Sequence, residues 1–271
     1  MQEFAEGVSP EEIEHQKLVA KDTLERYSGS KAEEFQPYLL LTNFPRYVDY
    51  FAATYNAVSH EGAMFKVAHS KELGVSILDF KIGSPAAALV VDLCSFLPIY
   101  GALLLGMCGG LREDYKVGEF FVPVASIRGD GTSDFYFPPE VPALANFTVQ
   151  KVVSAVLEQE KRAHHIGITH TTNKRFWEFN SDFRNRLQVT RPQAVEMECA
   201  TLFTASYSHR LPLGALLLIS DLPLTPRGAK TKDSSESVFA NFMPEHIRIG
   251  VQIITTLQKV ERLKAYRKHV H

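Results

Sequence analysis

The sequence predicts an α/β fold in which helices cover both faces of a mixed sheet. Strand and helix patterns alternate along the chain, and several strands, such as residues 99–111, are apolar throughout, as strands buried on both faces are. Long strands at 118–129 and 164–173, and a hairpin at 63–83, indicate that the sheet is mixed and not purely parallel.

Helix ends are marked by capping residues. Ser9 is the predicted N-cap of the first helix, Pro10 its first residue, Glu12 the partner in a capping box and Gly29 its end. Ser84 is the predicted N-cap of a later helix. The other predicted strands are 37–43, 193–197 and 214–221, and the other predicted helices are 45–56, 84–96, 141–162, about 177–187, 198–210 and about 239–263.

Length and composition limit the class of protein. The chain of 271 residues has no linker, repeat or low-complexity tract, so one domain over 1–271 is expected, with a helical extension over 1–36. The net charge is −2 and no basic stripe is present, which argues against a nucleic-acid partner and leaves small anions possible.

The sequence also predicts a soluble, cytoplasmic protein. Its apolar runs are too short to span a bilayer, and its N-terminus lacks the apolar region of a secretory signal. Three sparse cysteines (Cys94, Cys108 and Cys199) indicate a reducing compartment and no disulfide framework. The histidines and cysteines show no metal-ligand spacing, so neither a metal nor a cofactor is expected.

Two strand ends could bind a ligand. The segment GMCGGL (106–111) follows a buried strand, and its glycines would let backbone N–H groups approach a ligand, although a tight turn explains it equally well. The strand 214–221 ends on Ser220 and Asp221, where open α/β sheets bind ligands. The alternative, a helix N-cap, is disfavoured by the nearby Pro223.

The stretch AVEMEC places Glu196 and Glu198 on one side of a strand and Met197 on the other. Glu198 then lies near the start of a helix, where simple complementation of the helix dipole is an equal alternative to a binding role. Further on, Phe176 and Trp177 could stack on a planar base, although aromatic residues near a helix start more often pack in the core.

The loop 126–140 carries Arg128, which could hold a phosphate by two hydrogen bonds or could simply be a solvated loop arginine. In chain order, GMCGGL, AVEMECATLF and LLISDLP resemble the nucleoside phosphorylase/nucleosidase superfamily. Within it, LLTNFPRYV, SIRGDGTSDFYFPPEVPAL, THTTNKRFWE and NFMPEHIRIG are similar to the AMP nucleosidases, over about 37–262.

The resemblance implies a three-layer α/β/α sandwich around a mixed, partly barrel-like sheet, assembled as a homohexamer. It implies hydrolysis of AMP by water to adenine and ribose 5-phosphate. Longer members carry an N-terminal regulatory domain. The residues before residue 37 are too few to form such a domain, so none is expected here.

The resemblance also assigns roles to residues. Glu198 would accept hydrogen bonds from the ribose hydroxyls, Met197 would pack on the sugar and Glu196 would support them. Asp221 would protonate purine N7, which requires that burial raise its pKa. Phe176 and Trp177 would stack on the base, and Arg46 and Arg128 would bind the 5′-phosphate. The other predicted substrate contacts are Asn43, Met107, Cys108, Gly109, Thr132, Ser133 and Ser220.

Two positions favour water over phosphate as the nucleophile. Many hexameric phosphorylases have Arg and Ser where this chain has Leu104 and Met107. No counterpart of the water-activating carboxylate of related nucleosidases is evident in 42–47. A purine nucleoside phosphorylase, another purine nucleosidase and a catalytically inactive nucleotide-binding protein are the alternatives.

Overall fold

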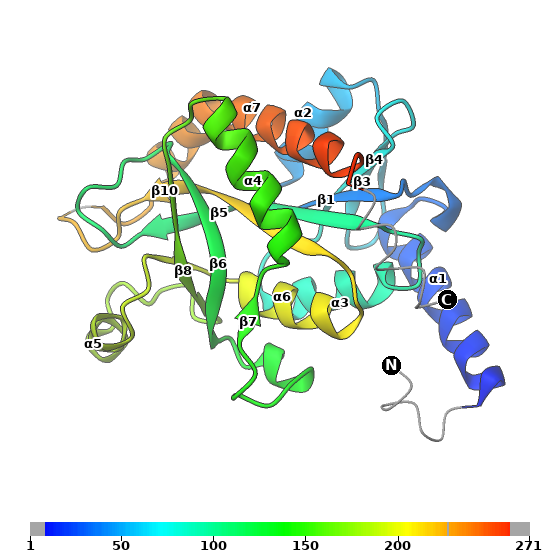
Figure 1. Cartoon of the computed structure of the whole chain (residues 1–271), viewed down its shortest axis with the longest axis horizontal. Helices are drawn as coiled ribbons and strands as arrows, with labels where there is room; N and C mark the ends of the chain where they lie inside the picture. Colours follow the sequence, from blue (N-terminus) through cyan, green and yellow to red (C-terminus); the bar gives the residue numbers. More distant parts are fainter. Residues whose placement is uncertain (1–8, 227, 261–271) are drawn as a thin grey trace.

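The computed structural model describes residues 9–226 and 228–260, and all of its strands belong to one ten-stranded mixed sheet (Figure 1). The strand order is β10-β6-β8-β9-β5-β1-β4-β3-β2, with β7 on β6. The strands are β1 (Tyr38–Thr42), β2 (Val58–Glu61), β3 (Lys66–Ser70), β4 (Val75–Asp79), β5 (Gly101–Gly110), β6 (Phe120–Gly129), β7 (Ala143–Leu144), β8 (His164–Thr172), β9 (Ala194–Glu196) and β10 (Leu213–Asp221).

Five of these strands close into a barrel, because β5 pairs with β10 as well as with β9. The remaining path runs outward from β5 through β1 and β4, which are parallel to β5 and to each other. It continues through β3, antiparallel to β4, to β2 at the edge, antiparallel to β3. The mixed, partly barrel-like sheet that the sequence resemblance implied is therefore confirmed.

Helices cover both faces of the sheet (Figure 1). One face packs against α3 and α6, and the other against α2, α4 and α7. The helices are α1 (Pro10–Ser28), α2 (Pro45–Thr54), α3 (Ser84–Cys94), α4 (Phe147–Gln159), α5 (Ser181–Thr190), α6 (Cys199–Ser208) and α7 (Lys232–Leu257), and the short 3-10 helices are η1 (Ala32–Glu34) and η2 (Thr132–Phe135).

Strands such as β5 have continuous apolar sequences because both of their faces are buried, and each face packs in a different hydrophobic core. In β5, Leu104 and Cys108 belong to the core beneath α3 and α6, whereas Leu103 and Leu105 pack with α4 and α7. Successive side chains of a strand point to opposite faces, so a strand that is covered on both faces carries apolar residues at nearly every position.

Most predicted elements are present, and their ends differ in instructive ways. Ser9 caps α1 and Gly29 ends it in a left-handed conformation, as predicted. Ser84, in contrast, is not an N-cap, since Gly83 holds that position and Ser84 opens the helix. The predicted helix at 141–162 begins only at Phe147, because Asn146 caps it with its side chain.

Two further helix starts were wrong, and one strand was missed. Helix α5 begins at Ser181 after an Asn180 cap, four residues later than predicted, and α7 begins at Lys232, seven residues earlier. The predicted end of that helix, 261–263, lies outside the described residues, as do residues 1–8 of the N-terminal extension. Strand β2 was missed because its residues Val58–Glu61 are mostly exposed and lack an apolar pattern.

All three cysteines are free and buried, in agreement with the absence of a disulfide framework. No helix in the described part of the chain is long and apolar enough to cross a membrane.

Candidate active site

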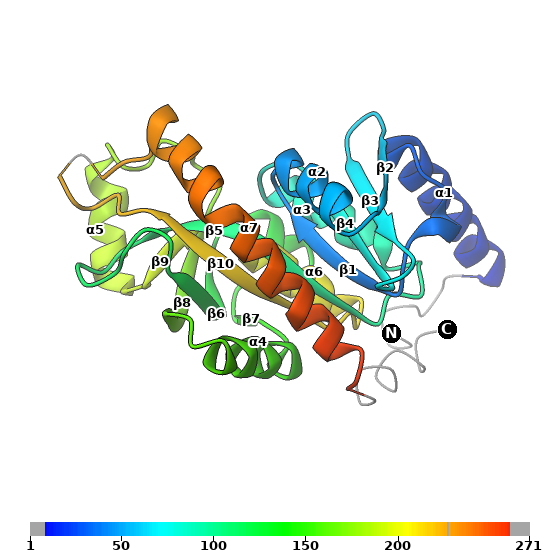
Figure 2. The ribbon, with the colours of Figure 1, turned by 90° about the horizontal axis from the view of Figure 1, so that it is seen from above.

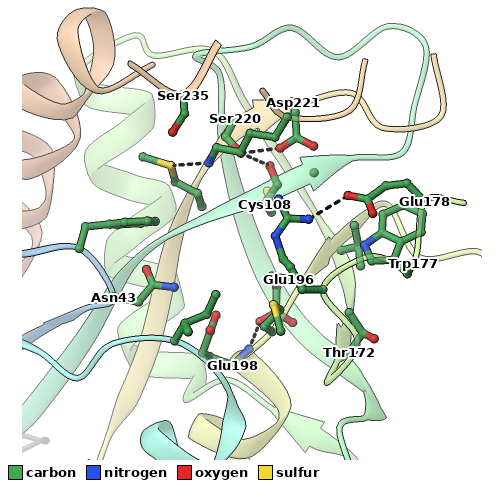
Figure 3. A pocket seen from close by; sticks show the side chains of 18 of the residues that line it. Asn43, Cys108, Thr172, Trp177, Glu178, Glu196, Glu198, Ser220, Asp221 and Ser235 are labelled. Atoms are coloured by element: carbon green, nitrogen blue, oxygen red, sulfur yellow. Dashed lines mark hydrogen bonds and ion pairs between the residues drawn. The ribbon is translucent and has the colours of Figure 1, made fainter. Parts of the chain in front are cut away.

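A cavity of about 380 Å³ opens at the ends of β5, β9 and β10 (Figure 3). That volume lies within the range of small-molecule sites. The sequence predicted ten of the residues that line it: Asn43, Met107, Cys108, Gly109, Trp177, Glu196, Met197, Glu198, Ser220 and Asp221. The lining residues that sequence reasoning missed are Phe44, Ile82, Thr172, Arg175, Glu178, Val195, Lys230, Thr231 and Ser235.

The floor of the cavity is formed where β5 and β10 run side by side. Ile219 pairs with Cys108, and Asp221 pairs with Gly109, so Ser220 is an extra residue that bulges from the ladder. A bulge redirects the side chains around it. Gly109 faces the ring of Pro223, and a Cβ there would lie only 3.0 Å from the proline Cγ, so any side chain would force the proline ring to shift by a few tenths of an ångström.

Asp221 is the acid of this floor. The Ser220 hydroxyl donates to Asp221 Oδ1 at 2.6 Å. Burial raises the pKa of Asp221, while the Ser220 hydrogen bond and the charge of Lys230 partly oppose that rise. A carboxyl group with a raised pKa is suited to donate a proton near neutral pH.

Glu196 supports the turn between β9 and α6. Its Oε2 accepts the backbone N–H groups of Glu198 and Cys199, each at 2.6 Å, and its Oε1 accepts the Thr171 hydroxyl. An ionised carboxylate near exposed N–H groups of a helix start is favourable. Strand β9 ends at Glu196, so the predicted strand alternation does not extend to Glu198.

Glu198 faces the cavity from the start of α6 (Figure 3). Its Oε1 accepts the Gly83 N–H at 2.8 Å, which ties the loop before α3 to the turn before α6. Burial and the neighbouring charge of Glu196 raise the pKa of Glu198 to about 8. Ser84 supports the same turn by donating to the Met197 carbonyl at 2.9 Å.

Asn43 lies beside Glu198, to which its side chain is hydrogen-bonded, and offers an unused acceptor. Its Oδ1 is buried and has no hydrogen-bond partner among the described residues. Buried polar atoms are nearly always paired, so this oxygen is available to a hydroxyl or amino group of a ligand.

Two of the described residues that line the cavity are cationic, and neither was predicted. Lys230 precedes α7, and its Nζ lies 3.4 Å from Met107 Sδ, while burial lowers its pKa against the opposing charge of Asp221. Arg175 follows β8 and pairs with Glu178 at 2.9 Å, with 44% of its side chain exposed. Arg175 lies in the segment THTTNKRFWE, where the sequence assigned roles only to the two aromatic residues, and Lys230 lies in no recognised motif.

The two predicted phosphate arginines do not line the cavity. Arg128 is 7% exposed, and all five of its N–H groups donate to one adjacent segment: to the side chains of Ser133 and Asp134 and to the carbonyls of Pro138, Val141 and Phe137. Arg46 forms a bidentate pair with Glu236 at 2.6 and 2.9 Å. A guanidinium has five donors, so Arg128 has none left for a ligand.

Three other predicted contacts also lie outside the cavity lining. Thr132 and Ser133 belong to η2, where Ser133 is fully buried and bonds to Asp130 and Arg128. Phe176 is 75% exposed, and only Trp177, which packs against Phe183 with ring centroids 5.3 Å apart, reaches the cavity.

Comparisons with known proteins place this site in a family. A model of the phosphorylase superfamily matches residues 33–255. AMP nucleosidase of Escherichia coli K12 is 27% identical over 87% of this chain, which spans only 58% of that protein. Uridine phosphorylase of Treponema pallidum is 27% identical over 75% of this chain and 84% of its own length.

This chain also matches almost the whole length of a protein of known structure. The crystal structure of AMP nucleosidase from Bacteroides thetaiotaomicron superposes with a TM-score of 0.80 and 32% identity, over 91% of this chain and 99% of that one. The family model spans most of the chain, including every strand described above. The chain therefore belongs to the phosphorylase superfamily.

Proposed function

We propose that this protein hydrolyses the N-glycosidic bond of AMP to give adenine and ribose 5-phosphate. The observation that carries the proposal is the placement of Asp221, at the end of β10, and Glu198, at the start of α6, in one cavity, with a pKa raised by burial in each. The similarity to AMP nucleosidases supports the choice of substrate.

In the proposed mechanism, Asp221 donates its proton to purine N7 as the bond between C1′ and N9 breaks, so the base leaves without a full negative charge. Glu198 accepts hydrogen bonds from the ribose hydroxyls, and these strengthen as the sugar becomes oxocarbenium-like. The oxygen of water bonds to C1′ from the side of Met107–Gly109. The attacking water loses one proton to solvent, and Asp221 regains one.

Around this core, Met197 packs on the sugar and Trp177 stacks on the base. The Asn43 Oδ1 accepts a sugar hydroxyl, because it has no protein donor in the described chain. Arg175 receives the 5′-phosphate, since its partly exposed side chain lies at the rim of the cavity. Phe176, Thr132, Ser133, Arg46 and Arg128 are left out of this proposal, because none of them lines the cavity.

Phosphorolysis is the alternative, because uridine phosphorylases are also among the relatives. The Leu104 side chain lies in the core and only Met107 reaches the cavity, and neither offers a hydrogen bond to inorganic phosphate. A single domain, assembly as a homohexamer and a cytoplasmic location stay predictions.

Chromatography of AMP and of adenosine, each incubated with the protein with and without inorganic phosphate, tests the proposal. Adenine and ribose 5-phosphate from AMP without phosphate are the expected products. Cleavage of adenosine only in the presence of phosphate, with ribose 1-phosphate as product, would establish the phosphorylase instead. No cleavage of either substrate would leave the catalytic proposal without support.

A further inference from the structure

A second group of polar side chains converges at the edge of the sheet and shares no residue with the cavity. Glu34 of η1, His60 of β2 and His69 of β3 each present one ligand atom, and these atoms lie within 4.8 Å of one another. Strands β2 and β3 lie beside α1, as Figure 2 shows, at the end of the sheet path that leads away from β5.

The hairpin itself brings the two histidines together. Val58 pairs with His69 and His60 pairs with Val67, so His60 and His69 are diagonal neighbours on one face of the ladder. Such neighbours are within reach of long side chains. Their ring centroids lie 5.7 Å apart, and η1 adds Glu34 from a different part of the chain.

His60 has an unsatisfied nitrogen in this group. Its Nε2 is buried and has no hydrogen-bond partner among the described residues. Glu34 Oε2 lies 3.6 Å from this nitrogen, which is too far for a hydrogen bond. A buried nitrogen without a partner costs free energy and calls for an explanation, such as an ion bound there.

His69 is held in the orientation of a ligand. Its Nδ1 lies 2.8 Å from the Ser76 hydroxyl, which also accepts the Gln36 N–H at 2.8 Å. Its Nε2 is turned toward the group and lies 2.9 Å from the Ser30 hydroxyl. Metal-binding histidines commonly use their second nitrogen in such an orienting hydrogen bond.

The Ser30 hydroxyl links two of the three side chains. It donates to Glu34 Oε2 at 2.8 Å and lies 2.9 Å from His69 Nε2. These two ligand atoms are therefore turned toward one point, as two ligands of a single ion would be.

We propose that Glu34, His60 and His69 form a binding site for a divalent transition metal, for which Zn²⁺ is the best match. Two imidazole nitrogens and one carboxylate oxygen are a donor set typical of zinc. The Ser30 hydroxyl or a water molecule takes the fourth position. On binding, the ligand atoms, which lie within 4.8 Å of one another, would have to come to about 3.3 Å apart, the spacing in a tetrahedral zinc site.

The metal would fasten the N-terminal segment to the sheet edge. Glu34 belongs to the segment between α1 and β1, whereas His60 and His69 belong to the edge hairpin. A bound ion therefore joins two parts of the chain that otherwise meet through hydrogen bonds such as that between Ser30 and His69. The site lies outside the cavity and does not depend on the proposed reaction.

The test measures metal binding directly. The full chain is stripped with EDTA, dialysed and titrated with Zn²⁺ and with Co²⁺. We expect one tightly bound ion per chain, visible d–d bands of four-coordinate Co²⁺ and a rise in melting temperature of about 5 °C at saturating Zn²⁺. His60→Gln and Glu34→Gln should lose these effects while melting close to the parent in EDTA.

His15→Gln is the matched control, because His15 is exposed on α1 and lies outside the group. It should bind Zn²⁺ as the parent does. Equal retention of Zn²⁺ by the parent and by both site variants, or Co²⁺ spectra of a six-coordinate aqueous type in the parent, would overturn the proposal. If the variants melt far below the parent in EDTA, Co²⁺ spectroscopy of the parent alone decides whether the protein has a four-coordinate metal site.

Discussion

The Ser220 hydroxyl donates to Asp221 Oδ1 at 2.6 Å, and this pair stands at the bulge where β10 loses its register with β5. Ser220 Oγ also lies 3.3 Å from the Cys108 carbonyl of β5. The acid is thus positioned from two strands at once, and one extra residue in the ladder sets the direction in which its carboxyl group points.

Asp221→Asn should abolish turnover of AMP and leave its binding largely intact. The amide fills the same space and accepts the Ser220 hydrogen bond, but it cannot supply the proton for N7, so kcat should fall by about 10²–10⁴. Steady-state kinetics and calorimetric titration with AMP check this. Asp233→Asn, at an exposed position on α7, is the control. Turnover at the parent rate would remove Asp221 from the mechanism.

Lys230→Met should move the falling limb of the pH profile to higher pH. The charge of Lys230 lowers the pKa of Asp221, so its removal raises that pKa and keeps the acid protonated further into the alkaline range. The measurement is kcat/KM for AMP against pH. Lys232→Met, at an exposed position beside it in the chain, should leave the limb in place. A limb that moves to lower pH in Lys230→Met would contradict the assignment.

Arg175→Ala should raise the KM for AMP much more than the KM for adenosine. The proposed contact is with the 5′-phosphate, which adenosine lacks, and a charge-assisted hydrogen bond contributes about 1.5–3 kcal/mol. That corresponds to an increase of about 10- to 100-fold in KM for the nucleotide alone. The matched control is Arg184→Ala, on an exposed position of α5. Equal changes for both substrates would exclude Arg175 from the phosphate site.

Local signals in the sequence predicted the parts of the site that lie at strand ends. Asp221 closes the apolar strand β10 and Glu198 follows the short strand β9, so both could be placed near strand ends from the local sequence alone. The caps of α1 were equally local, because Ser9, Glu12 and Gly29 act within one helix. Such features depend on neighbours in the chain.

Residues whose roles depend on distant partners could not be predicted. Arg128 has the right chemistry for a phosphate, but the fold of its own loop uses all of its donors. Lys230 reaches the cavity only because α7 begins where it does. His60 and His69 have no metal-ligand spacing, and they meet through the register of an edge hairpin that includes the unpredicted strand β2.

Arg128→Lys should destabilise the protein without selecting between AMP and adenosine. A lysine keeps the charge but offers three donors where Arg128 uses five, so at least two of the acceptors, which include the partly buried carbonyls of Val141 and Phe137, lose their partner. We expect a loss of about 2–4 kcal/mol in the free energy of unfolding, measured with urea. A stable variant with a KM raised only for AMP would return Arg128 to the phosphate site.

Glu198→Gln should remove a decline in stability between about pH 5 and pH 8. The pKa of Glu198 is about 8 in the folded protein, against 4.5 for an ordinary glutamate, so between these values the folded chain keeps a proton that the unfolded chain has lost. The stabilisation from this group is present below pH 4.5 and is lost as the pH rises through 8, by up to about 1.4 kcal/mol per pH unit.

Glutamine does not titrate and still accepts the Gly83 N–H. The measurement is urea unfolding of the parent, Glu198→Gln and the exposed control Glu72→Gln across that pH range. The difference in free energy of unfolding between the parent and Glu198→Gln should shift steadily in favour of the variant as the pH rises, while Glu72→Gln follows the parent. Parallel curves for the parent and Glu198→Gln would mean that Glu198 is ionised in the folded protein, with a pKa close to that of a free glutamate.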